Sequence, residues 1–300
     1  MDLRQIQYFV ALYEEGSVTR AARRLNVVQP ALSMQLAKME NEVGHKLFER
    51  SAQGMVPTAA ARTMYQLYLP ILRDLSSARQ QLDSLAGQVA GQVSVGIIVS
   101  VTQRVLLRTI EEFIARYPAV KLTVSEGYTV TLLDWVLAGQ LDFAVVNRPT
   151  GKLTLACGPI LTDEFVLATG KAARTRLPAR IRFKEIAQLK LVLPSKRHSL
   201  RAILEDHAEA QGVRLDPQLE LDSITGITEI VGRGALATVL PLTTIGHSLD
   251  SGLLRAHRIA SPKVVRDLIH VHHPRRPLSL AAGMLRDAIS STLAKAQSRS

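Results

Sequence analysis

The chain has 300 residues and a formal net charge of +11, and 47% of its residues are hydrophobic. This length exceeds the usual size of one domain, so we expect two domains, each with its own core. No run of 18 apolar residues occurs and Cys157 is the single cysteine, which excludes a helical membrane span and an internal disulfide. The opening MDLRQIQYFV indicates an amphipathic helix without a signal-peptide pattern, so we expect a cytoplasmic protein that does not bind membranes.

The basic excess is distributed unevenly along the chain. Residues 1–90 hold 10 basic and 8 acidic residues, whereas residues 171–201 hold 10 basic and 1 acidic residue. We interpret most of this basic block as a solvated surface, and we keep Lys196 and Arg197 as candidates for a positive lining around an anionic ligand. Attraction of the N-terminal region to nucleic acid must then come from a few placed side chains.

Helical periodicity predicts three short helices before residue 45. The first carries its apolar face from Leu3 to Tyr13 and ends at Gly16. Ser17 is suited to cap the second helix, and Asn26 is suited to the turn that follows it. Pro30 is tolerated in the first turn of the third helix because its missing amide would have no intrahelical partner there.

The third predicted helix has one apolar side and one mostly polar side. The polar side is small enough to enter the major groove of double-stranded DNA and to hydrogen-bond to base edges. We therefore expect these base-facing side chains: Gln29, Pro30, Ser33, Met34 and Lys38. Phosphate contacts are expected from the first two helices, through Arg4, Thr19, Arg20 and Arg23.

The run AARRLNVVQPALSMQLAKMENEVGHKLFER resembles the winged helix-turn-helix of LysR-type transcriptional regulators, whose pattern is AAxxLxxxQPxxSxxIxxLExxLGxxLFxR. The alternative to a DNA-binding motif is an ordinary amphipathic helix pair whose apolar residues only form a core. That alternative does not account for so many matches to the family pattern in one register. The resemblance implies sequence-specific DNA binding and a phosphate contact from Arg50. The matching residues are Ala21, Ala22, Leu25, Gln29, Pro30, Ser33, Glu40, Gly44, Leu47, Phe48 and Arg50.

The stretch HKLFERSAQGMVPT, residues 45–58, is the predicted wing of this domain, with Gly54 supporting its turn. The family usually carries an arginine just before the wing glycine, where this chain has Gln53. It also usually carries Thr-x-Ala-Gly after the wing, where this chain has Thr58 followed by three alanines. These departures leave minor-groove contact by the wing unassigned.

Residues 1–58 form the expected DNA-binding domain, with the helix-turn-helix at 18–37, and residues 59–86 continue as one helical pattern. Its apolar residues step at heptad spacing, which indicates pairing with a second helix. The expected dimerisation residues are Leu67, Ile71, Leu75, Leu82 and Leu85. Pro70 interrupts the pattern and should kink the helix. The resemblance implies a dimer or a tetramer, and residues 87–91 are the expected hinge.

From residue 92 the pattern changes to alternating strands and helices, which predicts parallel sheets covered by helices. LAGQLDFAVV and EIVGRGALATVLP match the effector domain of the same family, while EIVGRG and LPSKRHSL resemble its nitrogen-assimilation-control branch. The resemblance implies two α/β lobes of periplasmic-binding-protein type over residues 92–300. Lobe I should span about 92–161 and 267–300, and lobe II about 162–266.

Ligands of open α/β sheets bind beyond the carboxyl ends of strands, near helix N-termini. Three hydroxyl-bearing segments are expected to meet there, and Asn147 should end a strand that crosses between the lobes. The predicted effector-binding residues are Ser100, Thr102, Thr129, Asn147, Ser195, Lys196 and Arg197. For each hydroxyl, plain helix capping is an alternative of equal weight.

We expect neither catalysis nor a metal. His270 and His272 share a strand face, but no carboxylate or thiol lies at a fitting spacing. Asp163 and Glu164 are adjacent on a strand, so they point to opposite faces and cannot act as an acid–base pair. The sequence thus predicts a transcriptional regulator of promoter DNA that needs no cofactor and responds to a small anionic co-inducer, with RNA polymerase as a further partner. The alternatives are a solute-binding protein whose N-terminal helices serve protein interaction, and an α/β enzyme with a regulatory head.

Overall fold

The computed structural model describes residues 1–52, 54–85, 89–173, 177–260 and 262–298. The chain divides into two units, Met1–Gln88 with Ala138–Gln140, and Val89–Leu137 with Leu141–Ser300. Gln53 of the expected wing and Gly87 of the expected hinge lie outside the described residues. Within the described ranges, no helix is both long enough and apolar enough to cross a membrane.

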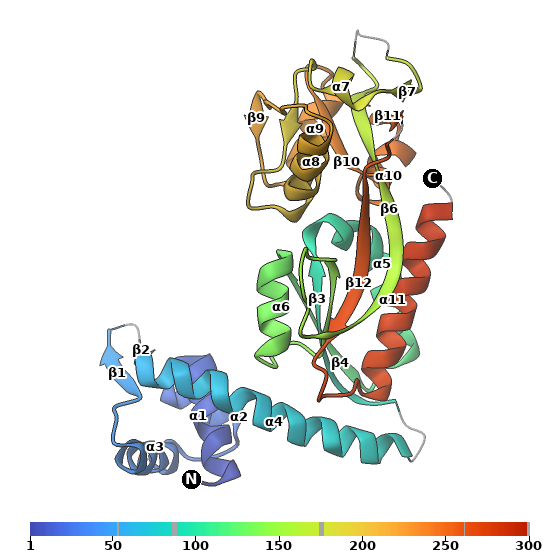
Figure 1. Ribbon diagram of the computed structural model, residues 1–300. Helices are drawn as coiled ribbons and strands as arrows, with labels where there is room; N and C mark the ends of the chain where they lie inside the picture. Colours follow the sequence, from blue (N-terminus) through green and yellow to red (C-terminus); the bar gives the residue numbers. More distant parts are fainter. Residues whose placement is uncertain (53, 86–88, 174–176, 261, 299–300) are drawn as a thin grey trace. The chain divides into compact units, whose positions relative to one another are not determined.

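The first unit begins with three helices: α1 Leu3–Glu15, α2 Val18–Arg24 and α3 Gln29–Val43 (Figure 1). The predicted caps are present, because Ser17 accepts a hydrogen bond from the amide of Arg20 and Gly16 ends α1 in the left-handed region at φ 58°. Asn26 adopts φ 54° in the turn between α2 and α3. Asparagine tolerates this conformation better than most residues, which explains its place in the turn.

The wing is a two-stranded antiparallel ribbon of β1 Phe48–Ser51 and β2 Gly54–Pro57. Glu40, on α3 and 8% exposed, holds its base. The Glu40 carboxylate accepts hydrogen bonds from the amides of Leu47 at 2.8 Å and Phe48 at 3.4 Å, and from Lys46 Nζ at 2.7 Å. Burial alone would favour the neutral acid, but these bonds together hold the pKa of Glu40 below its usual value. A charged side chain of α3 therefore fixes where the wing starts.

The predicted linker helix is present as α4, Ala59–Leu85, and it continues through Pro70. Its N-terminal part packs against the core of the first unit through Ala61, Met64 and Leu69. Tyr65 stacks on Tyr13 of α1, with the ring centroids 4.0 Å apart.

In the second unit, lobe I has a sheet in which β3 lies parallel to β4 and β5, and β12 continues it antiparallel to β5. Helices α5, α6 and α11 pack on this sheet. The strands are β3 Gly91–Ile98, β4 Val120–Gly127, β5 Phe143–Asn147 and β12 Val265–His272; the helices are α5 Val99–Arg116, α6 Thr129–Leu137 and α11 Leu280–Ser298.

Lobe II is built around the second half of β6, which pairs with β10 on one side and β11 on the other. Its strands are β6 Ala156–Gly170, β7 Arg180–Ile181, β8 Val192–Leu193, β9 Leu219–Glu220, β10 Ala237–Pro241 and β11 Leu254–Ile259. Its helices are α7 Phe183–Ile186, α8 Ser199–Ala210, α9 Ile224–Gly232 and α10 Leu242–Asp250.

Each lobe has its own core. One cluster of buried residues comes from positions 93–155 and 268–293, and the other from positions 165–264. The lobes are joined by β6 and β12, which run antiparallel side by side (Figure 1). The expectation that the strand ending at Asn147 crosses between the lobes is wrong, since β5 stays in lobe I. The first half of β6 instead pairs with β12 and its second half pairs with β10 and β11, so β6 crosses between the lobes.

We predict that Glu40→Gln lowers the free energy of unfolding by about 1–2 kcal/mol, because an amide cannot replace a charged acceptor that serves two backbone amides. Hydrogen exchange at the amides of Leu47 and Phe48 should quicken. Because the folded-state pKa is lowered, the contribution of Glu40 is full above its unfolded pKa of about 4.3 and is lost as the pH falls through the folded value. Glu49→Gln, on the exposed wing, is the control and should change stability by less than about 0.5 kcal/mol.

Candidate functional site: a recognition helix and an interlobe cavity

The α3 helix separates a buried stripe from a solvent face. Leu32 is 1% exposed and Met39 is fully buried, whereas Met34 on the opposite side is 65% exposed. Gln29, Pro30 and Lys38 are also exposed and Ser33 is half-buried. The side chains expected to face bases therefore lie on the surface, with the apolar residues beneath them.

The side chains expected to contact phosphates are exposed, and several are already held in place. The Arg4 guanidinium bonds to the Tyr8 hydroxyl at 2.8 Å, and Arg20 pairs with Glu15. The Thr19 hydroxyl lies 3.3 Å from Gln29 Oε1, which links α2 to the start of the recognition helix. Arg23 and Arg50 are exposed as well.

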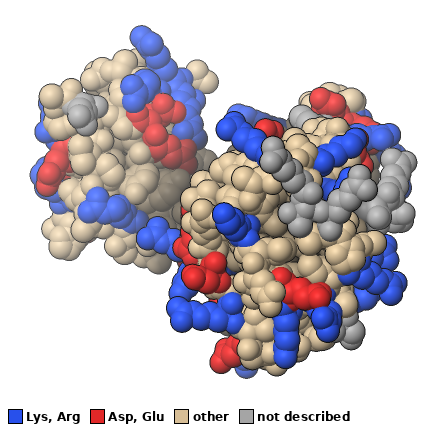
Figure 2. Space-filling model, turned by 90° about the horizontal axis from the view of Figure 1, so that it is seen from above, with Lys and Arg blue, Asp and Glu red and all other residues tan. Residues whose placement is uncertain are grey.

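On the face of the molecule drawn in Figure 2, the described basic side chains do not form one continuous patch. Figure 2 shows Lys and Arg scattered over the visible face and interspersed with Asp and Glu. Arg201, in the most basic stretch of the sequence, is 2% exposed and pairs with Glu205 and Glu220, so it is not a solvated charge.

Apolar side chains remain exposed along α4. Leu67 is 64% exposed, Ile71 45% and Leu82 67%, while Leu75 is half-buried. The side chain of Leu85 lies outside the described part of the structure. A helix that leaves a heptad stripe in water has an unsatisfied apolar face.

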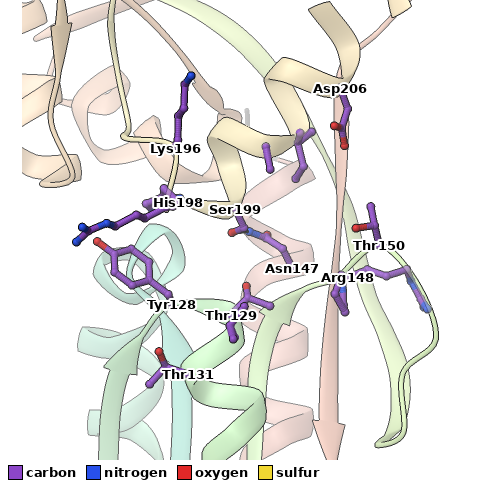
Figure 3. Close-up of a pocket in the computed structure, with 15 residues that line it drawn as sticks. Tyr128, Thr129, Thr131, Asn147, Arg148, Thr150, Lys196, His198, Ser199 and Asp206 are labelled. Atoms are coloured by element: carbon purple, nitrogen blue, oxygen red, sulfur yellow. Dashed lines mark hydrogen bonds between the residues drawn. The ribbon is translucent and has the colours of Figure 1, made fainter. Parts of the chain in front are cut away.

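A cavity of about 390 Å³ lies between the lobes, where α6 and α8 begin (Figure 3). Its wall includes Thr129 at the start of α6, Asn147 at the end of β5 and Ser199 at the start of α8. The other lining residues are Tyr128, Val130, Thr131, Arg148, Pro149, Thr150, Lys196, Arg197, His198, Ala202, Ile203 and Asp206. Two helix N-termini therefore direct partial positive charge and unpaired amides toward one space.

The polar groups at the centre of this cavity are uncharged. Thr129 is 5% exposed, and its hydroxyl has no hydrogen-bond partner among the described residues. Asn147 Nδ2 donates to Ser199 Oγ at 2.7 Å, which joins lobe I to lobe II. In Figure 3, Lys196 extends away from these three side chains. Charged side chains of both signs also line the cavity, namely Arg148, Lys196, Arg197 and Asp206.

His198 and Tyr128 close one side of the cavity, with their rings edge to face at 5.5 Å. His198 Nδ1 caps α8 by accepting from the amide of Leu200, so this nitrogen carries no proton. Burial, aided by the Arg266 guanidinium and opposed by Asp222, lowers the pKa of His198 to about 4. The ring is therefore neutral near pH 7. Burial and the bonded Asp222 carboxylate raise the pKa of Tyr128.

The structure brings together Thr129, Asn147, Lys196 and Arg197 from the expected effector site. Two expected residues differ. Ser100 does not line the cavity, because α5 begins at Val99 and turns this hydroxyl inward, and Ser195 does not line it, because His198 rather than Ser195 caps α8. The side chain of Thr102 lies outside the described part of the chain.

Arg266 is a buried charged residue behind the cavity that the sequence patterns did not single out. It is fully buried, and it faces Asp163 across the pairing of β12 and β6. Its Nε and Nη2 lie 3.0 and 2.8 Å from Asp163 Oδ2, and its Nη1 bonds to Ser100 Oγ at 2.8 Å and to Asn147 Oδ1 at 3.4 Å. Nη2 also reaches the hydroxyls of Thr243 and Thr244 at the start of α10, both at 3.1 Å.

The Arg266 contacts fix the orientation of the Asn147 amide. Because Oδ1 accepts from the guanidinium, Nδ2 faces the cavity and Ser199. A signal for this arrangement was present in the sequence, where Asp163 and Arg266 are charged residues inside otherwise apolar strands. Asp163 and Glu164 do point to opposite faces, as expected, since Asp163 is fully buried and Glu164 pairs with Lys263.

We predict that Arg266→Met destabilises the second unit by about 3–5 kcal/mol, because it leaves the Asp163 carboxylate buried without a partner. The double change Arg266→Met with Asp163→Leu should recover most of this loss. Trp135, the single tryptophan, packs against the lobe I core, so its fluorescence during urea unfolding reports this unit. Equal destabilisation by the single and the double change would contradict the prediction.

Comparison with known proteins places both units in one family. Residues 3–62 match the model of the bacterial regulatory helix-turn-helix protein of the lysR family, and residues 86–294 match the LysR substrate binding domain. The second match alone covers more than half of the chain. The first favours DNA binding over the alternative in which the N-terminal helices serve only protein interaction.

Individual relatives agree with these matches. The chain is 28% identical to the nitrogen assimilation regulatory protein nac of Klebsiella aerogenes, over 98% of this chain and 96% of that protein. The Escherichia coli K12 nac protein is 26% identical over 80% of this chain and 78% of its own length.

Solved structures share the fold. Full-length OxyR from Pseudomonas aeruginosa aligns with a TM-score of 0.73 at 22% identity, over 98% of this chain and 94% of that chain. Full-length CbnR complexed with its target DNA aligns with a TM-score of 0.69 at 17% identity, over 99% and 100%. The chain therefore belongs to the LysR family of DNA-binding transcriptional regulators, and its second unit is the effector-binding domain.

Proposed function

We propose that α3 reads base edges in the major groove through Gln29, Pro30, Ser33, Met34 and Lys38. The observation that supports this role is that Gln29, Pro30, Met34 and Lys38 are exposed and Ser33 is half-buried, whereas Leu32 and Met39 are buried. The proposed phosphate contacts are Arg4, Thr19, Arg20, Arg23 and Arg50, which are all exposed. Phosphate contacts would set the register of the protein on the duplex without reading its sequence.

We propose that the interlobe cavity binds the effector, and that this effector is a small anion. The observation that carries the proposal is the buried, unpartnered hydroxyl of Thr129 beside two converging helix N-termini. Buried polar groups are nearly always hydrogen-bonded, so a ligand oxygen is a fitting partner for this hydroxyl. Asn147 and Ser199 would donate to the same ligand, and Lys196 and Arg197 would raise its local concentration from the rim.

We propose that Ser100 supports this site indirectly, through Arg266 and Asn147, rather than by touching the effector. Because contacts to Asn147 and Ser199 come from different lobes, a ligand bound to both favours the arrangement in which the lobes approach. The effector would bind the closed arrangement of the lobes more tightly than the open one. This difference in affinity is how the effector would change the DNA-bound state.

We propose that the protein works in the cytoplasm as a dimer or tetramer on promoter DNA, with RNA polymerase as a further partner. The exposed stripe of Leu67, Ile71 and Leu82 on α4 supports the dimer, since a second copy of the helix would bury it. The matched relatives act as regulators, and we assign this chain no enzymatic reaction and no cofactor.

We predict that Gln29→Ala and Arg50→Ala weaken DNA binding in different ways. Loss of a base contact should cost about 1–3 kcal/mol and relax the preference at one base pair, whereas loss of a phosphate contact should weaken all sequences alike and reduce the salt slope by about 1. Fluorescence anisotropy on a duplex selected from a random library measures both. Arg116→Ala, on α5, is the control for lost charge and should bind like the unaltered protein.

We predict that Thr129→Val lowers affinity for the bound anion about tenfold or more, because valine keeps the shape but removes a hydrogen bond to a charged group. The probes are sulfate, inorganic phosphate and a series of small mono- and dicarboxylates, and the measurement is the thermal shift of the full chain. His198 is neutral well above pH 4, so its titration should not alter binding between about pH 6 and 8.

Thr123→Val is the matched control, because Thr123 lies exposed on β4 away from the cavity. An unchanged shift in Thr129→Val, for every probe that shifts the unaltered protein, would place the anion elsewhere.

A further inference from the structure

The recognition helix exposes two large apolar side chains. Val28 is 69% exposed and Met34 is 65% exposed. Outside α4, no other large apolar side chain described in the first unit exceeds 46%. Single exposed apolar side chains are common on protein surfaces, so exposure alone does not assign these two a role. Their place at the start and on the solvent face of the proposed recognition helix is what points to a ligand.

Val28 also stands where a capping residue is expected. It is the N-cap of α3 and provides no side-chain hydrogen bond, whereas Asp2 and Ser17 do so for α1 and α2. Ser, Thr, Asp and Asn are strongly preferred at this position because they satisfy an unpaired amide. Val28 thus provides neither a cap nor core packing, and such local departures concentrate at functional positions.

Met34 points directly away from the core. At about 100° per residue, it lies nearly opposite the stripe formed by Leu32 and Met39. It is therefore on the solvent face of α3. Methionine is long and flexible, which suits contact with a small apolar group at the floor of a groove.

We propose that Val28 and Met34 select thymine by packing against its C5-methyl group in the major groove. That methyl is the apolar feature of a base edge that otherwise presents donors and acceptors. Neither side chain donates a hydrogen bond to the polar groups of a base edge. Each therefore contributes most binding free energy where it packs against a methyl group. The proposal rests on the proposed base-facing role of α3. It assigns a base to Met34 and adds Val28, the N-cap residue, to the base-facing set.

The spacing of the two side chains bears on the site they would read. Val28 and Met34 are six positions apart in the sequence, which corresponds to about 9 Å along a helix axis. Stacked base pairs rise by about 3.4 Å, so the two thymines should lie roughly two to three base pairs apart. Gln29, between them in sequence, can donate and accept at the polar edge of a neighbouring base.

The test uses deoxyuridine, which lacks only the C5-methyl group and leaves base pairing and phosphates unchanged. A duplex selected from a random library by the full-length protein is prepared with each thymidine replaced in turn, and binding is measured by fluorescence anisotropy at fixed salt. We expect about a fourfold loss of affinity for each contacted methyl, the ratio that burial of one such group implies. In Met34→Ala the loss should vanish at one position, and in Val28→Ala at another.

Leu3→Ala is the matched control, because it removes an exposed apolar side chain from α1 and should leave every thymine-to-uracil ratio unchanged. The melting temperature and low-salt binding to random DNA show that each variant is folded. Equal affinity for the thymine and uracil duplexes, or ratios that persist in both alanine variants, would overturn this inference while leaving the recognition helix in place. Failure of the unaltered protein to select any sequence would instead overturn the proposed base-facing role itself, and this inference with it.

Discussion

The ion pair between Arg266 and Asp163 is the interaction on which the second unit depends. The two residues are direct partners across the only strands of the described chain that run through both lobes, and both side chains are buried. Burying two charges costs more than most contacts return, so the pair persists only because its remaining donors are satisfied. Ser100, Asn147, Thr243 and Thr244 satisfy them, and these residues come from three further elements. One guanidinium thereby fixes where α5, α10 and the end of β5 meet.

This arrangement explains the chemistry of the cavity. A buried arginine beside the site provides orientation rather than a free charge, since its donors are already engaged. The groups left to meet a ligand are a hydroxyl, an amide and the N-termini of α6 and α8. Fixed dipoles of this kind need no reorganisation when an anion arrives. Of the basic residues in the 171–201 stretch, Lys196 and Arg197 line the cavity, whereas Arg201 is paired internally with Glu205 and Glu220.

The first unit also contains a buried charged side chain whose hydrogen bonds join two elements. Glu40 is charged and buried, and its bonds to Leu47 and Phe48 tie the wing to the same helix that carries the solvent face of Gln29 and Met34. Recognition helix and wing therefore move as one piece. The core residues Leu32 and Met39 hold that piece against α1 and α2, so the DNA-facing side chains need no role in folding.

The sequence by itself determined the helix-turn-helix, the wing, the long α4 helix and the two-lobed α/β class. These follow from local periodicity, from caps such as Ser17 and turns such as Asn26, and from many matches to one family pattern in a single register. It also indicated Thr129, Asn147, Lys196 and Arg197, which line the interlobe cavity, because helix starts after strands are local features. Only the tertiary structure decided that β6 and β12 join the lobes, that Arg266 meets Asp163, and that Ser100 and Ser195 stay out of the cavity. Those outcomes depend on strand pairing between residues about 100 positions apart, and no local pattern encodes such a register.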